Sequence, residues 1–496
     1  MKYFSTERDC VMSACRAETV SSPRSPYCYR TDLEEEVLDE IRPSPSEYLS
    51  VRDAVKKIVD LLEEAKQLLG IDYTVSVQGS FAKDTWLSGD VDVDVFLLFD
   101  KSYCLSITAV NRILSTLRGK VFSSYSVEYS YAQHPYIRVY VEPVWVEIVP
   151  GCKIEVGEKP LTAVDRTPLH TSYVKKRLKT WQRDEVRLLK KFLKGIGVYG
   201  AEIAVRGFSG YLVELLIATF GCFRRVLEAA TSWKPPIYIA PPGTTLEQAH
   251  RLRHKYPDSI MFVPDPVDPG RNVAAAVSKR SLALFVLAST LYLKTPSKAF
   301  FFPPKPPSLP DKLLEKAGWR AKRIIVVILK SSKRVAEDIA WGIGWRVARR
   351  IASLLKNLGF TVADYSVYAS PEAVWVLVEV EEEAKPPLVL HRGPPAWKKD
   401  NMIKFVEKHS TAASVGPWVG EDGVLYVFKK PAHISPKEAI ASRVKEWLPK
   451  SASGYSVSVY RLDEAVNEGL LSGDLVEKVY QFVVKAPPWL KPWEYS

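Results

Sequence analysis

The chain has 496 residues, too many for a single hydrophobic core, so we expect several domains. Its formal net charge of +12 at pH 7 favours a polyanionic partner, although a basic enzyme that binds no polyanion would carry the same charge. No apolar run reaches membrane-spanning length, and six scattered cysteines, none in a Cys-x-x-Cys pair, argue against a zinc site and for a reducing, cytoplasmic compartment.

The N-terminal third is predicted to be an α+β domain behind a short extension. Residues 1–32 are rich in serine, arginine and cysteine and show little periodicity, which indicates a disordered extension or a misassigned start. Helices are predicted at 33–41, 48–69 and 107–118 from the helical spacing of apolar residues. Strands are predicted at 73–78, 91–99, 121–131, 136–141 and 144–149. These elements define a first domain at residues 33–155.

Three further regions follow. Residues 156–302 are predicted to form a helical central domain, with helices at 171–195, 209–220, 224–232 and 278–293. A proline-rich linker near 300–310 precedes a strand–helix–strand–strand pattern, which predicts an α+β body at residues 303–385. The remaining region, residues 386–496, contains a predicted strand at 424–428 and a helix at 436–448. The predicted fold class is therefore α+β and multidomain.

The strand at 91–99 carries aspartates on one face. Period two places Asp90, Asp92 and Asp94 on that face and valines on the other. Like charges side by side disfavour a strand unless a cation lies between them, and carboxylate oxygens are ligands that suit magnesium. Glu147, on another predicted strand, is the candidate third carboxylate. The alternative is a solvated strand that binds nothing.

A Gly-Ser turn ends the strand before the acidic one. Gly79 lets the backbone approach a phosphate closely. The Ser80 hydroxyl and the amides that follow can donate hydrogen bonds to triphosphate oxygens, and Lys83 adds a positive charge one turn later. We therefore predict that this turn holds phosphates and that Asp92 and Asp94 hold the Mg²⁺ ions that act on them.

The order of these features resembles a known superfamily. An apolar strand, Gly-Ser, a gap of helix length and then Asp92-Val93-Asp94-Val95 form the fingerprint of polymerase-beta-like nucleotidyltransferases. Longer runs resemble archaeal CCA-adding enzymes more specifically. These runs are QGSFAKDTWL at 78–87, HPY at 134–136, AVDRTPLH at 163–170, EVRLLK at 185–190, GVYGAE at 197–202, VRGFSGY at 205–211, DPVD at 265–268 and RNVAA at 271–275.

The resemblance implies a polymerase-beta-like palm, a helical central domain and C-terminal α+β modules that grip tRNA. It implies the addition of cytidine, cytidine and adenosine to the 3′ end of tRNA from CTP and ATP, without a nucleic-acid template and with Mg²⁺. Family members form dimers, so a homodimer is implied, although the residues themselves leave the oligomeric state open.

Several residues match functional positions of the family. The metal-binding catalytic acids are matched by Asp92, Asp94 and Glu147. The nucleotide-binding positions are matched by Gly79, Ser80, Lys83, Thr167, His170, Lys190, Tyr199 and Arg271. His134 matches a position near the growing RNA end. Glu147 stands where aspartate is usual, and Lys83 stands where arginine is usual, which keeps the charge but loses bidentate phosphate geometry.

A basic segment at 175–194 is the predicted RNA-binding surface of the central domain. Arg183, Arg187, Lys190 and Lys194 fall on one face at helical spacing. Such a face can neutralise a triphosphate at one end and RNA phosphates along its length. Arg392 is a further candidate tRNA contact in the C-terminal half. The alternative is a solvated basic helix.

Two rival functions stay open at this point. Another template-independent RNA nucleotidyltransferase, such as a poly(A) polymerase, would share the palm but add a long tail. A tRNA-binding protein with an inactive palm would share the fold, although the presence of both Asp92 and Asp94 argues against it.

Overall fold

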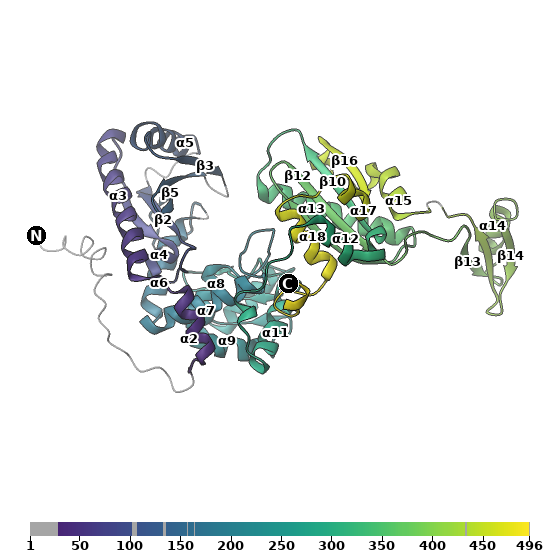
Figure 1. Cartoon of the computed structure of the whole chain (residues 1–496), viewed down its shortest axis with the longest axis horizontal. Coiled ribbons are helices and arrows are strands. Elements are labelled where there is room, and N and C mark those ends of the chain that lie inside the picture. Colours follow the sequence, from purple (N-terminus) through teal and green to yellow (C-terminus); the bar gives the residue numbers. More distant parts are fainter. Residues whose placement is uncertain are drawn as a thin grey trace, which may run out of the picture. The chain divides into compact units, whose positions relative to one another are not determined.

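The computed structural model describes residues 28–101, 107–131, 135–155, 157–162, 164–431 and 434–495. The chain divides into two compact units at residue 302, with the short stretch 202–204 grouped with the second unit (Figure 1). Across these described residues, no helix combines the length and the apolar character needed to cross a membrane.

The first unit begins with a mixed five-stranded sheet, the palm sheet. Its strand order is β1-β2-β5-β4-β3, and β2 pairs antiparallel with β1 and parallel with β5. The strands are β1 (Thr74–Gln78), β2 (Asp92–Phe99), β3 (Val127–Tyr131), β4 (Pro135–Val141) and β5 (Val144–Cys152). The helices around them are α3 (Pro45–Leu69), the short α4 (Gly79–Lys83) and α5 (Ile107–Thr116), whereas α2 (Asp32–Ile41) packs on the helical region that follows in the chain.

Helices α3 and α5 bury one face of the palm sheet (Figure 1). Val93, Val95 and Leu97 of β2 are fully buried in a core that apolar residues of both helices complete. Because side chains alternate along a strand, burial of this face leaves Asp92 and Asp94 on the other one. The period-two prediction for this strand is confirmed.

The rest of the first unit is mainly helical. Its helices are α6 (Thr167–Arg177), α7 (Thr180–Gly195), α8 (Gly210–Phe220), α9 (Phe223–Ala230), α10 (Leu246–Lys255) and α11 (Lys279–Lys294), and its short strands are β6 (Ile237–Tyr238), β7 (Met261–Phe262), β8 (Pro264–Asp265) and β9 (Asp268–Asn272). The prediction of one helix at 171–195 is wrong. Leu178 has an extended ψ of 127°, and α7 starts anew beyond it, with the Gln182 side chain accepting from the Lys179 amide.

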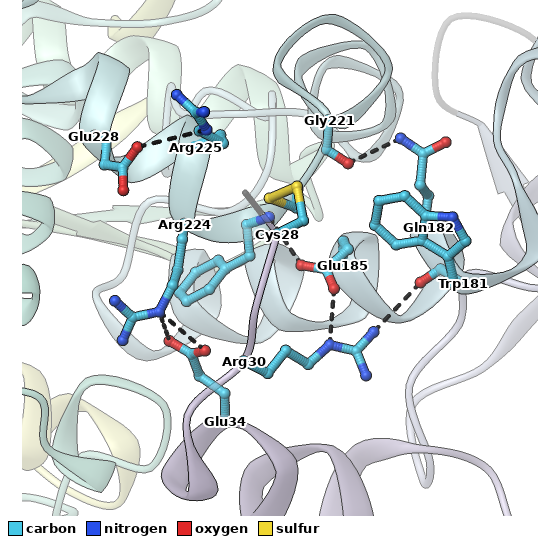
Figure 2. Close-up of a disulfide and its surroundings, with 12 residues drawn as sticks. Cys28, Arg30, Glu34, Trp181, Gln182, Glu185, Gly221, Arg224, Arg225 and Glu228 are labelled. Atoms are coloured by element: carbon cyan, nitrogen blue, oxygen red, sulfur yellow. Dashed lines mark hydrogen bonds and ion pairs between the residues drawn. A yellow bond between two sulfur atoms is a disulfide. The ribbon is translucent and has the colours of Figure 1, made fainter. Parts of the chain in front are cut away.

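The segment before α2 is attached to this helical region, as Figure 2 shows. Cys28 forms a disulfide with Cys222, with Cα atoms 5.9 Å apart and a sequence separation of 194 positions. Arg30 is buried and donates to Glu185 Oε1 at 2.7 Å. Residues 28–32 therefore differ from the predicted extension, and the expectation for residues 1–27 lies outside the described residues.

The disulfide also corrects the expectation of reduced thiols. Sequence spacing could not reveal a pair that only the fold brings together. Arg224 contacts Glu34, a fully buried carboxylate on α2, at 3.0 Å, so a second ion pair fixes the same segment (Figure 2). Closing so long a loop restricts the unfolded chain, which stabilises the folded first unit.

The second unit is built on a four-stranded antiparallel sheet of order β11-β12-β10-β16. Its strands are β10 (Ile324–Ser331), β11 (Val362–Ala369), β12 (Ala373–Val380) and β16 (Tyr455–Arg461), and its helices are α12 (Pro310–Ala317), α13 (Glu337–Asn357), α15 (Pro436–Ser442), α16 (Val444–Trp447), α17 (Leu462–Asn467) and α18 (Asp474–Val484). β16 differs from the prediction, because it completes the body sheet although its residues were assigned to the final region.

A small module lies in the chain between β12 and α15. It is a three-stranded sheet of β13 (Val389–Pro395), β15 (Val424–Lys429) and β14 (Val415–Val419), with α14 (Lys399–His409) packed on it. Sequence periodicity predicted only β15 of these strands. Prolines in β13 and β14 obscured the other two, because proline is usually depleted in strands.

Candidate active site

Three carboxylates line the open face of the palm sheet. In the parallel ladder Asp94 of β2 lies directly opposite Glu147 of β5, and Asp92 lies two residues earlier on β2. The predicted third carboxylate is thus on the adjacent strand and in register with Asp94. The valine faces of both strands are buried below, which fixes the direction of all three side chains.

These carboxylates raise one another's proton affinity. Burial, with a further contribution from the charge of Asp92, raises the pKa of Asp94 to about 6. Burial followed by the charges of Asp94 and Asp92 raises the pKa of Glu147 to about 7. Arg138 of β4 is the nearby cation, with nitrogen–oxygen distances of 3.4 Å to both Asp92 and Glu147. Arg138 lowers the pKa of Glu147 and Lys83 lowers that of Asp94, but neither cation outweighs burial.

This donor set fits a divalent metal ion. Carboxylate oxygens are hard ligands, and a cation would relieve the repulsion that raises both pKa values. Within the described ranges, no group of three or more His, Cys, Asp or Glu side chains converges closely enough to hold a metal as it stands. Arg138 pairs with Asp92 and Glu147, so a metal ion bound by these two carboxylates would compete with the guanidinium.

Gly79 has a specific task at this site. It starts α4 with φ of 71°, and a Cβ there would collide with Oδ2 of Asp94. Glycine is needed because the Asp94 carboxylate occupies the space of a side chain. The sequence argument chose Gly79 for phosphate approach, whereas the contact in the structure is with Asp94.

A buried network joins α4 to the helical region. Lys83 Nζ lies 2.6 Å from Glu214 Oε2, and the Thr85 hydroxyl donates to Glu214 Oε1 at 2.9 Å. Lys190 of α7 is 4% exposed and donates to the carbonyl of Thr85 at 2.9 Å. Burial lowers the pKa of Lys190 to about 8, against the opposing effect of Glu214. Lys83 and Lys190 thus contact the two residues of one hydrogen-bonded pair, Glu214 and Thr85.

Tyr199 approaches the same place from another loop. A Cβ built on Gly210, the first residue of α8, would lie 2.9 Å from the Tyr199 hydroxyl and 3.9 Å from Cε of Lys190. The predicted nucleotide-binding residues Lys190 and Tyr199 are therefore brought together at the start of α8. Ser80 lies on α4 beside Gly79.

His170 and Arg271 meet at one buried carboxylate. His170 Nε2 lies 2.8 Å from Oδ2 of Asp265, and Arg271 donates to the same oxygen at 2.9 Å. Tyr211 stacks on the imidazole with ring centroids 4.0 Å apart. Thr167 begins α6 three residues before His170. The sequence runs predicted His170 and Arg271, but gave Asp265 no role.

The basic side chains on one face of α7 contact the palm segment. This differs from the prediction that the same face binds RNA. Arg183 and Arg187 pair with Asp84, Lys190 bonds Thr85, and Lys194 pairs with Asp90. The three partners of these four side chains lie in the palm segment 84–90. Helical spacing identified the shared face but could not tell which surface it meets.

Arg187 is the clearest case of this correction. Its side chain is 6% exposed and donates to the carbonyl of Trp86 at 2.9 Å and to Asp184 at 3.0 Å. The Arg187 guanidinium faces the palm segment rather than solvent in this structure, which argues against the RNA contact predicted there. Arg183 keeps 32% exposure and remains a candidate.

Two further RNA contacts were predicted, at His134 and Arg392. Arg392 lies on β13 of the small module, with 67% of its side chain exposed and Asp422 at 3.3 Å. His134 lies outside the described residues. Asp265, Glu214 and Arg138 were missed as site neighbours. Glu214 gave a signal, since it interrupts an otherwise apolar helix, and Asp265 lies in the family-like run DPVD.

Comparison with known proteins agrees with this arrangement. Residues 58–170 match the nucleotidyltransferase domain, 184–302 the second domain of tRNA nucleotidyltransferases and 320–461 the C-terminal domain of CCA-adding enzymes. A CCA-adding enzyme of Sulfurisphaera tokodaii is 37% identical over 459 residues, covering 92% of this chain and 100% of the relative. The chain belongs to the CCA-adding enzyme family.

Other relatives agree with that membership. A CCA-adding enzyme of Saccharolobus shibatae is 36% identical over 466 residues, with the same two coverages. Among solved structures, the Cid1 poly(U) polymerase bound to MgATP is similar with a TM-score of 0.41 and 16% identity, covering 53% of this chain and 94% of that one. Nucleotidyltransferases, whose domain matches residues 58–170, generally use divalent metal ions.

Proposed function

We propose that this member of the CCA-adding family completes the 3′-terminal CCA of tRNA from CTP and ATP, without a nucleic-acid template. The observation that supports this most strongly is the register of Asp94 with Glu147 across β2 and β5, beside a glycine that the Asp94 carboxylate requires. A cation-deficient carboxylate pair next to buried lysines suits the transfer of a nucleotidyl group from a triphosphate.

In this reaction the tRNA 3′ hydroxyl attacks the α-phosphate of CTP or ATP. A phosphodiester bond forms, the bond to the leaving pyrophosphate breaks and the hydroxyl proton passes to solvent. We propose Asp92, Asp94 and Glu147 as the residues that would hold Mg²⁺. When bound, Mg²⁺ would lower the pKa of the attacking hydroxyl and offset charge on the pyrophosphate.

The buried lysines provide the charge for the triphosphate. Lys83 and Lys190 converge with Tyr199 near the start of α8, and Ser80 supplies a hydroxyl from α4. Glu214 neutralises Lys83 in the structure, so a triphosphate would compete with that carboxylate. Lys83 acts as a point charge here, which suits a terminal phosphate without demanding bidentate geometry.

The nucleotide would be oriented from the helical region. His170 and Arg271 share Asp265, and Thr167 lies one turn from His170 on α6. Arg183 and Arg392 are the proposed tRNA contacts in the described residues, acting on backbone charge rather than on base sequence. A homodimer and a cytoplasmic location stay predictions.

The deciding experiment supplies tRNA that lacks its CCA end. With CTP and ATP together we expect three added nucleotides and no more, and with CTP alone two cytidines. A long tail from ATP alone would indicate a poly(A) polymerase instead. Absence of both product and pyrophosphate would indicate a tRNA-binding protein with an inactive palm. Sequencing the products separates these results.

A further inference from the structure

Asp265 is a fully buried carboxylate with four partners. Its side chain has 0% exposure. Oδ2 accepts from Arg271 and lies 2.8 Å from His170 Nε2, while Oδ1 accepts from the Tyr211 hydroxyl and the Val267 amide, both at 3.1 Å. Asp265 therefore reaches no ligand itself, yet it contacts both candidate nucleotide-reading side chains.

This contact fixes which nitrogen of His170 carries the proton. Burial is the main cause that lowers the pKa of His170, so the ring is neutral at pH 7. Asp265 has its own pKa held below the usual value, because His170, the Val267 amide and Arg271 together outweigh the effect of burial. An ionised carboxylate accepts only, so the imidazole proton lies on Nε2.

The other ring nitrogen, Nδ1, is then a hydrogen-bond acceptor. No hydrogen bond to it is found from any residue that the structure describes, and the His170 side chain retains 12% exposure. Tyr211 covers one face of the ring and limits its rotation. Lys83, the proposed triphosphate ligand, is close enough to act electrostatically on His170. The acceptor thus lies near the proposed nucleotide.

Arg271 supplies the complementary donors. Its NH1 is fixed by the same Asp265 oxygen that holds His170, while its side chain keeps 38% exposure. The nitrogens of two side chains that share one oxygen lie within a few ångströms of each other. One buried anion thereby sets an acceptor and a group of donors side by side.

We propose that Asp265 is a positioning residue that makes His170 Nδ1 an acceptor for a hydrogen-bond donor of the incoming nucleotide and holds Arg271 beside it. This rests on the proposed function. The donor is either an exocyclic amino group, which cytosine and adenine carry and uracil lacks, or a ribose hydroxyl. An acceptor at Nδ1 would repel the uracil carbonyl that replaces the amino group.

The test uses full-length Asp265→Asn with tRNA lacking CCA and with CTP, UTP or 2′-deoxy-CTP at saturating metal. We expect KM for CTP to rise about tenfold with little change in kcat, as loss of a charge-assisted hydrogen bond predicts. Either the preference for CTP over UTP or that over 2′-deoxy-CTP should fall by a similar factor, which identifies the amino group or the hydroxyl as the donor.

These preferences are ratios within one preparation, so partial unfolding does not change them. A purely structural role would lower the rate with all three nucleotides equally and would overturn the proposal. Asp268→Asn is the matched control, since Asp268 lies in the same hairpin and pairs with Arg166 at 2.9 Å. Its preferences should equal those of the wild type.

His170→Gln provides a second measurement that leaves Asp265 intact. It should lose the same preference as Asp265→Asn, and the double variant should lose no more than either single one, because both changes remove one interaction. Additive losses would contradict the proposal. If the wild-type chain itself adds no cytidine to the tRNA, the proposed function fails instead, so the two failures are distinguishable.

Discussion

Two groups of carboxylates in the first unit have opposite electrostatic settings. On the palm sheet, Asp94 and Glu147 lie opposite one another, and burial raises both pKa values although Lys83 lies near Asp94 and Arg138 near Glu147. In the helical region, the Asp265 side chain is fully buried, yet His170, the Val267 amide and Arg271 hold its pKa below the usual value. The negative charge of the palm pair is not fully offset by protein groups, so a bound cation would stabilise it. The charge of Asp265 is offset by its protein partners, so it needs no ligand.

The largest effect is expected where the cation-deficient pair is broken. Asp94→Ala should reduce nucleotide incorporation by about a thousandfold or more, because a proposed metal ligand on β2 is removed. A radiolabelled CTP assay measures this. Binding of tRNA, measured separately, should persist, and substantial turnover by the variant would show that Asp94 has been placed in the wrong role.

Removing one partner of a buried ion pair should instead lower the free energy of unfolding. Arg187→Met leaves Asp84 without its buried partner and should lower the free energy of unfolding by about 3 kcal/mol. Arg183→Met, which removes a more exposed partner of the same aspartate, should cost only about 0–1 kcal/mol. Urea unfolding gives both values. Equal costs would mean that burial does not distinguish the two arginines.

Gly79→Ala tests the geometry of the palm cluster without altering its charge. The new Cβ would push the Asp94 carboxylate aside, so we expect a loss in kcat of about a hundredfold, typical of a displaced catalytic group. Gly89→Ala is the matched control, because Gly89 has a similar φ of 69° but nothing within 4 Å of its added Cβ. Similar losses in both variants would point to backbone strain instead.

Lys190→Met should reduce activity less than Gly79→Ala does. Unlike Arg187→Met, it should not lower the stability of the protein at pH 7. We expect KM for CTP to rise about tenfold through loss of a triphosphate contact. The folded pKa of Lys190, about 8, lies below its ordinary 10.5, so the charged lysine costs stability below pH 8, and that cost disappears as pH rises to 10.5.

Unfolding measurements across this pH range check the sign. The variant should match or exceed the wild type in stability at pH 7 and lose that advantage above pH 10. Lys176→Met, at an exposed position on α6, should show neither the KM change nor the pH dependence. A variant that is less stable than wild type at pH 7 would mean that the contacts with Thr85 outweigh burial.

The sequence predicted the palm cluster better than the Asp265 cluster, for a physical reason. Period two and the valine face determine where Asp92 and Asp94 point, and Glu147 follows from strand pairing. Contacts between distant segments leave no such periodic signal. Three features depend on which distant surfaces pack together in the fold. They are the burial of Arg187, the disulfide of Cys28 and the carboxylate that His170 and Arg271 share.

The most direct test of the contrast is to neutralise one acid from each cluster, without metal or nucleotide, at pH 8. Glu147→Gln removes a charge whose folded pKa of about 7 exceeds its ordinary 4.5, so its cost to folding grows from pH 4.5 to 7 and is fully present at pH 8. We therefore expect Glu147→Gln to be more stable than wild type by about 1–3 kcal/mol. Asp265→Asn should be less stable, because its lowered pKa contributes stability at this pH. Destabilisation of similar size in both variants would contradict the account.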